Sequence, residues 1–190
     1  MQQDYDVLIV GGGLAGNCLA LALQNSNLKV AIVEANTRAQ LHDSPAGDRA
    51  LALAQGSVRM LQDLEIWEHA KAAATPIAKI HVSDQGHFGK TRLSAKQEGV
   101  AALGYVITAR DLEAAVADLV EQAGVEQICP ARVMGIASDA EFAHVSLKQG
   151  AESLNISAKL VVGADGGQST VRKLLDIEQS MTEYQQTAIV

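Results

Sequence analysis

The chain has 190 residues, of which 48% are hydrophobic and 19% are charged, and its formal net charge is −7. This length and composition allow one real core and one domain or slightly more. The acidic balance and the lack of any Lys/Arg cluster argue against a nucleic-acid partner. No apolar stretch reaches the 18 residues of a membrane span, and the N-terminus lacks the regions of a signal peptide, so a cytoplasmic protein is expected.

The N-terminal segment predicts a strand, a tight turn and a helix. An apolar run over residues 6–10 leads into Gly-x-Gly-x-x-Gly at Gly11, Gly13 and Gly16, and an Ala/Leu-rich stretch follows over 14–24. Gly11 permits the turn, Gly13 lets the backbone approach a phosphate, and Gly16 lets helix and strand pack closely. The helix N-terminus adds unpaired N–H donors and the positive end of its dipole. This pattern is typical of a site for a dinucleotide pyrophosphate.

A second apolar run ends on a carboxylate. Residues 29–33 lead into Glu34, which lies 18 positions after Gly16. An acid at the end of the second strand, about 20 residues after the glycines, is where the ribose hydroxyls of an adenosine are bound. We therefore expect Glu34 to bind the ribose, and the two strands with their connecting helix to begin a parallel sheet.

The remaining elements follow from hydrophobic periodicity and from turn residues. A loop that can reach a ligand is expected first, and one long helix after it. The expected elements are, in chain order, a loop over 35–48, a helix over 50–74, hairpin strands over 77–83 and 90–94, a strand over 105–108, a helix over 110–123, a strand over 125–128 that returns to the parallel sheet, an antiparallel meander over 132–137, 144–147 and 154–157, and a fully buried strand over 160–163.

A glycine-rich turn follows the last of these strands. It holds one acid, Asp165, beside Gly166, and it leads into a helix that Ser169 can cap and that contains Arg172. An acid at the carboxyl end of a parallel strand, next to a glycine that permits close approach, can receive a ribose hydroxyl or order phosphate-bound water. Asp-Gly alone is more often a simple turn, but together with the N-terminal glycines it favours a cofactor site.

These motifs together resemble the para-hydroxybenzoate hydroxylase-like family of FAD-dependent aromatic hydroxylases. The N-terminal glycines are similar to the first FAD motif of that family. Asp165-Gly166, with Ser169 and Arg172, is similar to its Asp-Gly motif, which serves both FAD and the nicotinamide cofactor. The resemblance covers essentially the whole chain.

The resemblance also marks three positions between the two motifs. Arg49 matches a family arginine that lies near the FAD, Arg110 matches a position that contacts the cofactor, and Val133 falls where the backbone meets the adenine. Without the resemblance, either arginine would be assigned to a surface ion pair. The cofactor-binding residues that it implies are Gly11, Gly13, Leu14, Ala15, Gly16, Glu34, Arg49, Arg110, Val133, Asp165 and Gly166.

Within this family, residues 80–89 and 47–53 are similar to the 2-octaprenyl-6-methoxyphenol hydroxylases of ubiquinone biosynthesis. The resemblance implies a monooxygenase that hydroxylates a polyprenylated phenol with FAD, NAD(P)H and O2. The flavin carries that chemistry, so we expect no side chain here to act as acid, base or nucleophile, and no metal site. The polyprenyl substrate implies other ubiquinone-biosynthesis proteins or the inner face of a membrane as partners.

The expected fold is α/β: a Rossmann-like FAD-binding parallel sheet with an antiparallel β-meander and the beginning of a substrate-domain β-sheet. The resemblance places the FAD-binding domain at 1–76 and 95–178, and the start of the substrate-domain sheet at 77–94 and 179–190. The Gly-Asp motif of the family, expected well beyond Asp165, is absent from the sequence. We therefore expect a fragment that is inactive alone.

Two other kinds of protein are compatible with parts of this pattern. An NAD-linked Rossmann dehydrogenase would share the glycine motif and the acid after the second strand, but it predicts neither the hairpin nor the Asp165-Gly166 turn. A non-enzymatic binding protein on the same FAD fold would share the whole architecture. Flavin absorbance separates the first alternative, and NAD(P)H consumption with a phenolic substrate separates the second.

Overall fold

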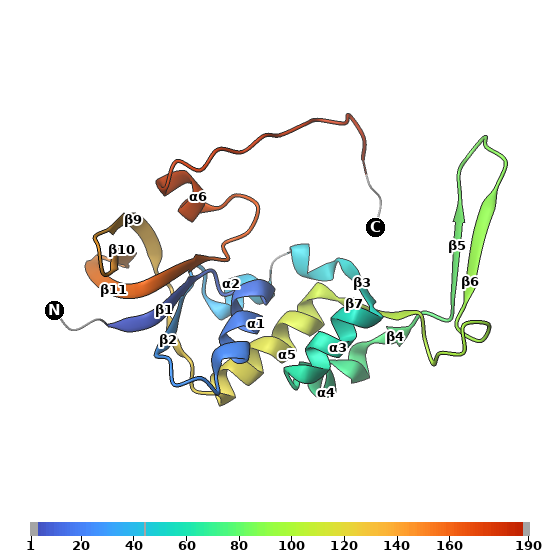
Figure 1. Ribbon diagram of the computed structural model, residues 1–190, viewed down its shortest axis with the longest axis horizontal. Helices are drawn as coiled ribbons and strands as arrows, with labels where there is room; N and C mark the ends of the chain where they lie inside the picture. Colours follow the sequence, from blue (N-terminus) through green and yellow to red (C-terminus); the bar gives the residue numbers. More distant parts are fainter. Residues whose placement is uncertain (1–3, 44, 188–190) are drawn as a thin grey trace. The chain divides into compact units, whose positions relative to one another are not determined.

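The computed structural model describes residues 4–43 and 45–187, and the chain forms two compact units (Figure 1). The first unit contains the chain up to position 44 and from Val116 onward, and the second contains Pro45–Ala115. The first is built on an extended sheet. The second combines a small sheet with short helices and a hairpin.

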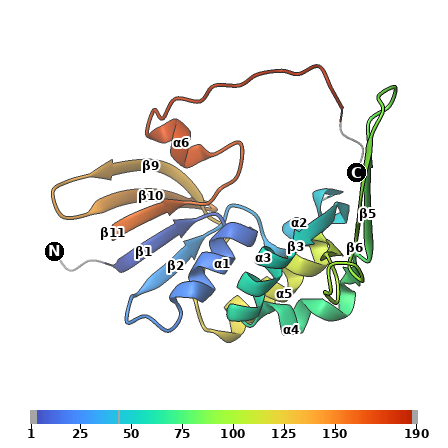
Figure 2. The same cartoon turned by 45° about the vertical axis from the view of Figure 1, so that its right-hand side comes forward.

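The first unit has a six-stranded sheet in the order β8-β2-β1-β11-β10-β9. Figure 2 shows β2, β1, β11, β10 and β9 side by side. β8, β2, β1 and β11 run parallel, and β10 and β9 continue the sheet in antiparallel pairs. The strands are β1 (Tyr5–Val10), β2 (Val30–Val33), β8 (Glu126–Ile128), β9 (Arg132–Ser138), β10 (Ala143–Gln149) and β11 (Glu152–Gly163). The predicted parallel sheet and antiparallel meander are therefore confirmed.

β1 lies inside the sheet because its sequence is almost wholly apolar. It pairs with β2 on one side and with β11 on the other, and Leu8 and Ile9 are fully buried. Near-continuous apolar runs are typical of parallel strands that are covered on both faces. The buried cluster around β1 contains Tyr5, Leu8, Val10, Ala31, Val33, Ala131, Val133, Val145, Leu147, Ala158 and Val171.

The prediction for the last strand was wrong in two respects. The strands expected over 154–157 and 160–163 form one continuous strand of 12 residues, β11. Ala158 is the residue at which β11 pairs with both neighbours, antiparallel with Ala143 of β10 and parallel with Tyr5 of β1. Leu160 is 55% exposed, so the strand is not fully buried. A short apolar run is compatible with a fully buried strand and with a strand that has one exposed face, and periodicity alone does not distinguish the two.

The segment after β2 contains a short helix where only a loop was expected. α2 (Arg38–His42) begins after Thr37, whose hydroxyl accepts a hydrogen bond from the N–H of Gln40, while the Gln40 side chain accepts one from the N–H of Thr37. This is a capping box, and Thr-x-x-Gln was its sequence signal. Arg38 also forms ion pairs with two acids of α5 (Ala109–Gln122), which attach the segment to that helix.

The second unit corrects the long helix expected over 50–74. Its first five residues form β3 (Ala50–Ala54), which pairs antiparallel with β7 (Gly104–Thr108). Alternating Ala and Leu suit a helix by propensity and a strand by their period of two, and here the pairing with β7 decides. The other elements of this region are α3 (Gln55–Asp63), α4 (Ile66–Ala70), β4 (Thr75–Pro76) and the 3-10 helices η1 (Pro45–Asp48) and η2 (Lys71–Ala73).

The helical part of that prediction holds after residue 54, with a break. Glu65 has a φ of +61° between α3 and α4, so the two helices are separate. Val58, Leu61 and Trp67 are buried. Trp67 packs edge-on against Tyr105, with ring centroids 4.8 Å apart. This tryptophan is therefore a core residue of the second unit.

The predicted hairpin is confirmed. β5 (Lys79–Ser83) pairs antiparallel with β6 (Lys90–Ser94), and the pair forms an arm of the second unit in both views. The domain boundaries expected at 77 and 94 remain a prediction. Residues 177–187 form no helix or strand, and positions 188–190 of the segment expected to start the substrate-domain sheet lie outside the described residues.

Candidate functional site

The turn between β1 and α1 (Leu14–Leu23) needs glycine at two positions. Gly11 has a φ of +111°, which favours glycine, and a Cβ there would lie 2.4 Å from the carbonyl oxygen of Ala164. A Cβ on Gly16 would lie 1.9 Å from the carbonyl oxygen of Gly11. Strand, turn and helix therefore approach too closely for any side chain at these two positions, as the glycine motif predicted.

Gly13 is glycine for a different reason. It is the N-cap of α1 with a φ of −78°, and a Cβ there would meet nothing within 4 Å. No side chain among the described residues caps this helix. The first N–H groups of α1 are therefore free of side-chain acceptors at a point where the backbone faces open space, and this is the arrangement that binds an anion.

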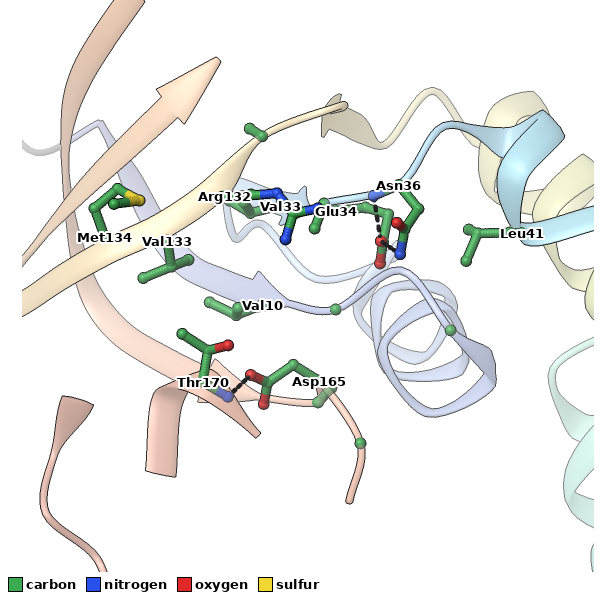
Figure 3. A pocket seen from close by; sticks show the side chains of 16 residues that line it. Val10, Val33, Glu34, Asn36, Leu41, Arg132, Val133, Met134, Asp165 and Thr170 are labelled. Carbon is green, nitrogen blue, oxygen red and sulfur yellow. Dashed lines mark hydrogen bonds between the residues drawn. The ribbon is translucent and has the colours of Figure 1, made fainter. Parts of the chain in front are cut away.

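A cavity of about 480 Å³ lies beside this turn (Figure 3). It is formed at the carboxyl ends of β1 and β2, by the start of β9, and by the turn after β11. Ligands of open α/β sheets bind at this edge, and the volume suits a small molecule. The lining residues are Val10, Gly11, Gly13, Val33, Glu34, Ala35, Asn36, Leu41, Ala131, Arg132, Val133, Met134, Ala164, Asp165, Gly166 and Thr170.

Glu34 lies at the end of β2 and uses its carboxylate to hold the cavity wall. Its Oε2 accepts a hydrogen bond from the N–H of Gly12 at 2.7 Å. Its Oε1 accepts two, from the N–H of Asn36 at 2.7 Å and from the Asn36 side chain at 3.2 Å. A carboxylate has about four acceptor positions, so one remains, on Oε2. Glu34 can therefore fix the turn and accept one hydroxyl of a ligand.

Asp165 lies in the turn after β11 and caps α6 (Thr170–Leu174). Its Oδ1 accepts from the Ser169 hydroxyl at 2.6 Å, and its Oδ2 accepts from the N–H groups of Thr170 at 2.5 Å and Val171 at 3.1 Å. Burial alone would raise the pKa of Asp165, but these hydrogen bonds outweigh it and lower the pKa. The carboxylate therefore stays ionised beside the cavity. Ser169 caps the helix, as predicted, by accepting from the N–H of Arg172.

The opposite wall of the cavity comes from the start of β9. The N–H of Ala131 donates to the carbonyl oxygen of Glu34 at 2.7 Å and ties this wall to β2. Val133 is buried in the core and also lines the cavity, and its contact with an adenine remains a prediction. Met134 is 57% exposed, and its side chain and that of Arg132 also line this wall.

The two predicted arginines belong to the second unit. Arg110 binds Asp48, with 2.7 Å between Nη2 and Oδ1, and it packs against the backbone of Gly47. Arg49 is exposed, and its carbonyl oxygen accepts from the N–H of Ala109 at 2.9 Å. The structure groups both with residues 45–115 rather than with the cavity. Their contact with a cofactor remains a prediction.

The sequence interpretation missed two residues that hold the site. Asn36 follows Glu34 by two positions and bonds its carboxylate. Asn17, on α1, donates from Nδ2 to the carbonyl oxygen of Gly12 at 2.7 Å. A short polar residue just after a strand is a recognisable turn signal, so Asn36 could have been noted. No spacing rule marks Asn17.

Neither cysteine has the character of a nucleophile. Burial raises the pKa of the Cys18 thiol. Burial and, secondarily, the charge of Glu34 raise the pKa of Cys129, whose Sγ donates to the carbonyl oxygen of Asn36 at 3.0 Å. Thiolates need the opposite surroundings. Over residues 4–43 and 45–187, no three His, Cys, Asp or Glu side chains gather as metal ligands.

The family described as "FAD binding domain" matches residues 4–189. The chain belongs to this family. Its resemblance to FAD-dependent hydroxylases is confirmed at the level of the family.

Relatives and a solved structure agree with this assignment. The FAD-binding domain is 32% identical to "Ubiquinone hydroxylase UbiL" of Rhodospirillum rubrum over 97% of this chain and 42% of that protein. It is 27% identical to "3-demethoxyubiquinol 3-hydroxylase" of Escherichia coli over 99% of this chain and 48% of that protein. The solved flavin-dependent monooxygenase PieE, in complex with FAD and substrate, has the same fold, with a TM-score of 0.75 and 23% identity over 93% of this chain and 33% of PieE.

The FAD-binding domain thus spans less than half the length of these curated relatives. None of the helices in its described residues has the length and apolar character needed to cross a membrane.

The residues present fit FAD. At Gly13 the backbone faces open space, since even an added Cβ would meet nothing within 4 Å, and the adjoining N-terminus of α1 has the N–H groups that suit a pyrophosphate. Glu34 keeps one acceptor position for a ribose hydroxyl. Backbone and apolar groups around Val133 offer a surface for an adenine.

Proposed function

We propose that this FAD-binding domain is part of an FAD-dependent monooxygenase that hydroxylates a polyprenylated phenol in ubiquinone biosynthesis. The observation that carries the proposal is the similarity to ubiquinone hydroxylases along 97–99% of the chain. The hairpin motif over 80–89, which resembles that of the 2-octaprenyl-6-methoxyphenol hydroxylases, supports the same substrate class. The overall reaction converts the phenol, O2, NAD(P)H and a proton into the hydroxylated phenol, NAD(P)+ and water.

FAD, when bound, supplies the redox chemistry of this reaction. The protein supplies binding and orientation. In this proposal Gly11, Gly13 and Gly16, with the N–H groups at Leu14 and Ala15, hold the pyrophosphate. Their dipole and hydrogen bonds match its negative charge.

The walls of the cavity complete the proposed cofactor site. Glu34 accepts a ribose hydroxyl through Oε2, and the backbone at Val133 meets the adenine. Asp165 and Gly166 form the turn at the other wall, where the ionised Asp165 carboxylate holds α6 in place. Arg49 and Arg110 are proposed to contact the cofactor from the second unit.

The substrate class also suggests where the protein acts. A polyprenyl tail resides in a bilayer, so we propose a cytoplasmic protein that works peripherally at the inner face of the membrane, with other ubiquinone-biosynthesis proteins as partners. The electron donor is proposed to be NADH or NADPH, bound only transiently.

The test uses the full-length protein. Purified protein should show flavin absorbance, and it should consume NAD(P)H in the presence of a prenylated phenol and O2. Under 18O2 the product should gain one labelled oxygen atom. A protein without flavin would support an NAD-linked dehydrogenase instead, a flavoprotein without turnover would support a binding protein, and a product without labelled oxygen would contradict hydroxylation.

A further inference from the structure

Asn17 is a polar residue in a buried place. It lies at the end of the first turn of α1, is 7% exposed, and has the buried residues Ala20 and Leu21 beside it on the same helix. Its side chain turns back toward the glycine turn, where Nδ2 donates to the carbonyl oxygen of Gly12 at 2.7 Å. Its Oδ1 is buried and has no hydrogen-bond partner among the described residues.

The unpartnered Oδ1 argues against a purely packing role for Asn17. Buried polar groups in stable proteins are normally paired, and an unpaired acceptor destabilises the folded state. An apolar side chain of similar size would fill this place without that cost. The asparagine is therefore poorly explained by packing, and its one hydrogen bond, to Gly12, is its distinguishing contact.

Gly12 is held from both sides by side chains. Its N–H donates to Oε2 of Glu34, and its carbonyl oxygen accepts from Asn17, both at 2.7 Å. The space beside Gly12 is tight, because a Cβ there would lie 3.1 Å from Cβ of Glu34. The two hydrogen bonds thus fix the peptide planes on either side of this residue.

The second of those planes joins Gly12 to Gly13. It is trans, because the only cis peptide among the described residues precedes Pro130. In a trans peptide the N–H points away from the C=O. Anchoring the Gly12 carbonyl on Asn17 therefore turns the N–H of Gly13 in the opposite direction, at the residue that lines the cavity and faces open space.

We propose that Asn17 is a positioning residue for FAD. By holding the Gly12 carbonyl, it orients the Gly13 N–H toward the pyrophosphate before the cofactor binds. Pre-orientation of a donor raises affinity because the binding site loses less freedom on binding. This inference rests on the proposed FAD site and goes beyond it by assigning a role to a residue outside the glycine motif.

The test compares two substitutions in the full-length protein. Asn17→Leu keeps the number and branching of the side-chain heavy atoms and removes both polar groups. The apo protein should melt at the same temperature or higher, while the Kd for FAD, measured by flavin fluorescence quenching, should rise at least tenfold. Asn17→Asp keeps the shape but, when ionised, has no donor for the Gly12 carbonyl oxygen. At pH 8 it should therefore bind FAD at least as poorly as Asn17→Leu does.

A pH series then separates orientation from packing. A protonated carboxyl can donate to the Gly12 carbonyl, and burial raises the pKa of such a group, so Asn17→Asp should regain FAD affinity between pH 8 and pH 5.5. Glu34 is the ionisable side chain on the other side of Gly12, and the wild type has it as well. The readout is therefore the change of the Kd for FAD with pH in the variant relative to the same change in the wild type. Asn155→Asp, at an exposed position of β11, is the matched control and should follow the wild type.

The outcomes are distinguishable. If the wild-type protein binds no FAD, the proposed function itself fails. If the wild type binds FAD and Asn17→Leu binds it equally well, the role of Asn17 is refuted alone. Parallel losses of apo stability and FAD affinity, with no recovery of Asn17→Asp at low pH, would make Asn17 a packing residue and also refute the proposal.

Discussion

Gly13→Ala should separate cofactor binding from folding. The new methyl group would meet no atom within 4 Å, and a φ of −78° suits alanine. Replacing glycine at a compatible position stabilises by about 0.4–1 kcal/mol, and losing glycine at an N-cap costs a few tenths to about 1 kcal/mol. The two terms nearly cancel, so the melting temperature should change by no more than about 4 °C.

The same methyl group would occupy the place where backbone and phosphate meet. If it breaks one charge-assisted hydrogen bond, FAD binding should weaken by about 1.5–3 kcal/mol. That corresponds to a rise in Kd of roughly 10- to 150-fold. Isothermal titration of the apo full-length protein with FAD measures this directly, and differential scanning calorimetry of the same samples measures stability.

Two further glycines serve as controls for this experiment. Gly56→Ala, at an exposed position of α3 with no atom within 4 Å, should raise stability by about 0.4–1 kcal/mol and leave FAD affinity unchanged. Gly16→Ala would place a methyl group 1.9 Å from the Gly11 carbonyl oxygen and should destabilise the fold itself, by more than the ~1–3 kcal/mol typical of overpacking. Wild-type FAD affinity in a folded Gly13→Ala protein would refute the placement of the pyrophosphate at this turn.

Other substitutions test the rest of the site and the core. In Glu34→Gln the amide N–H2 replaces one of the two oxygens that accept from the N–H groups of Gly12 and Asn36, so one donor faces another donor. FAD affinity should therefore fall more than tenfold in a fluorescence titration, and an unchanged Kd would contradict the role of Glu34. The folded-state pKa of Asp165 lies below its unfolded value of about 3.9, so its stabilisation is present above that pH and is lost as the pH falls through the lowered pKa. In urea unfolding at pH 7, the free energy of unfolding of the wild type should exceed that of Asp165→Asn by about 1–3 kcal/mol, and this difference should shrink below about pH 4. A constant difference from pH 7 to pH 3 would contradict the stabilising role of the ionised Asp165. Trp67→Ala should lower the free energy of unfolding by about 3–5 kcal/mol, and a loss under 1 kcal/mol would show that Trp67 is not core.

The parts of the molecule that follow from local sequence could be predicted. The glycine turn, the acid after β2 and the cap at Ser169 each depend on residues a few positions apart, so their geometry is encoded where they stand. The hairpin was equally local, because its turn residues lie between two short strand-forming runs.

The features that could not be predicted depend on partners far along the chain. Ala50–Ala54 is a strand because β7 lies beside it, and nothing in its own five residues decides against a helix. The exposure of Leu160 and the continuity of β11 depend on the strands that flank β11, which are β1 and β10. Asn17 lacks a motif because its partner is a backbone carbonyl, which every residue possesses.

The parallel pairing of β1 with β11 has a consequence for biosynthesis. Tyr5 emerges from the ribosome early, but its sheet partner Ala158 follows about 150 residues later. At about 5–20 residues per second, one edge of this apolar strand waits roughly 8–30 s for its neighbour. During that interval it presents unpaired backbone groups and bare hydrocarbon, the features that chaperones bind and that promote aggregation. Overexpression should therefore be limited by capture of the nascent chain, and slower translation would lengthen the period of risk.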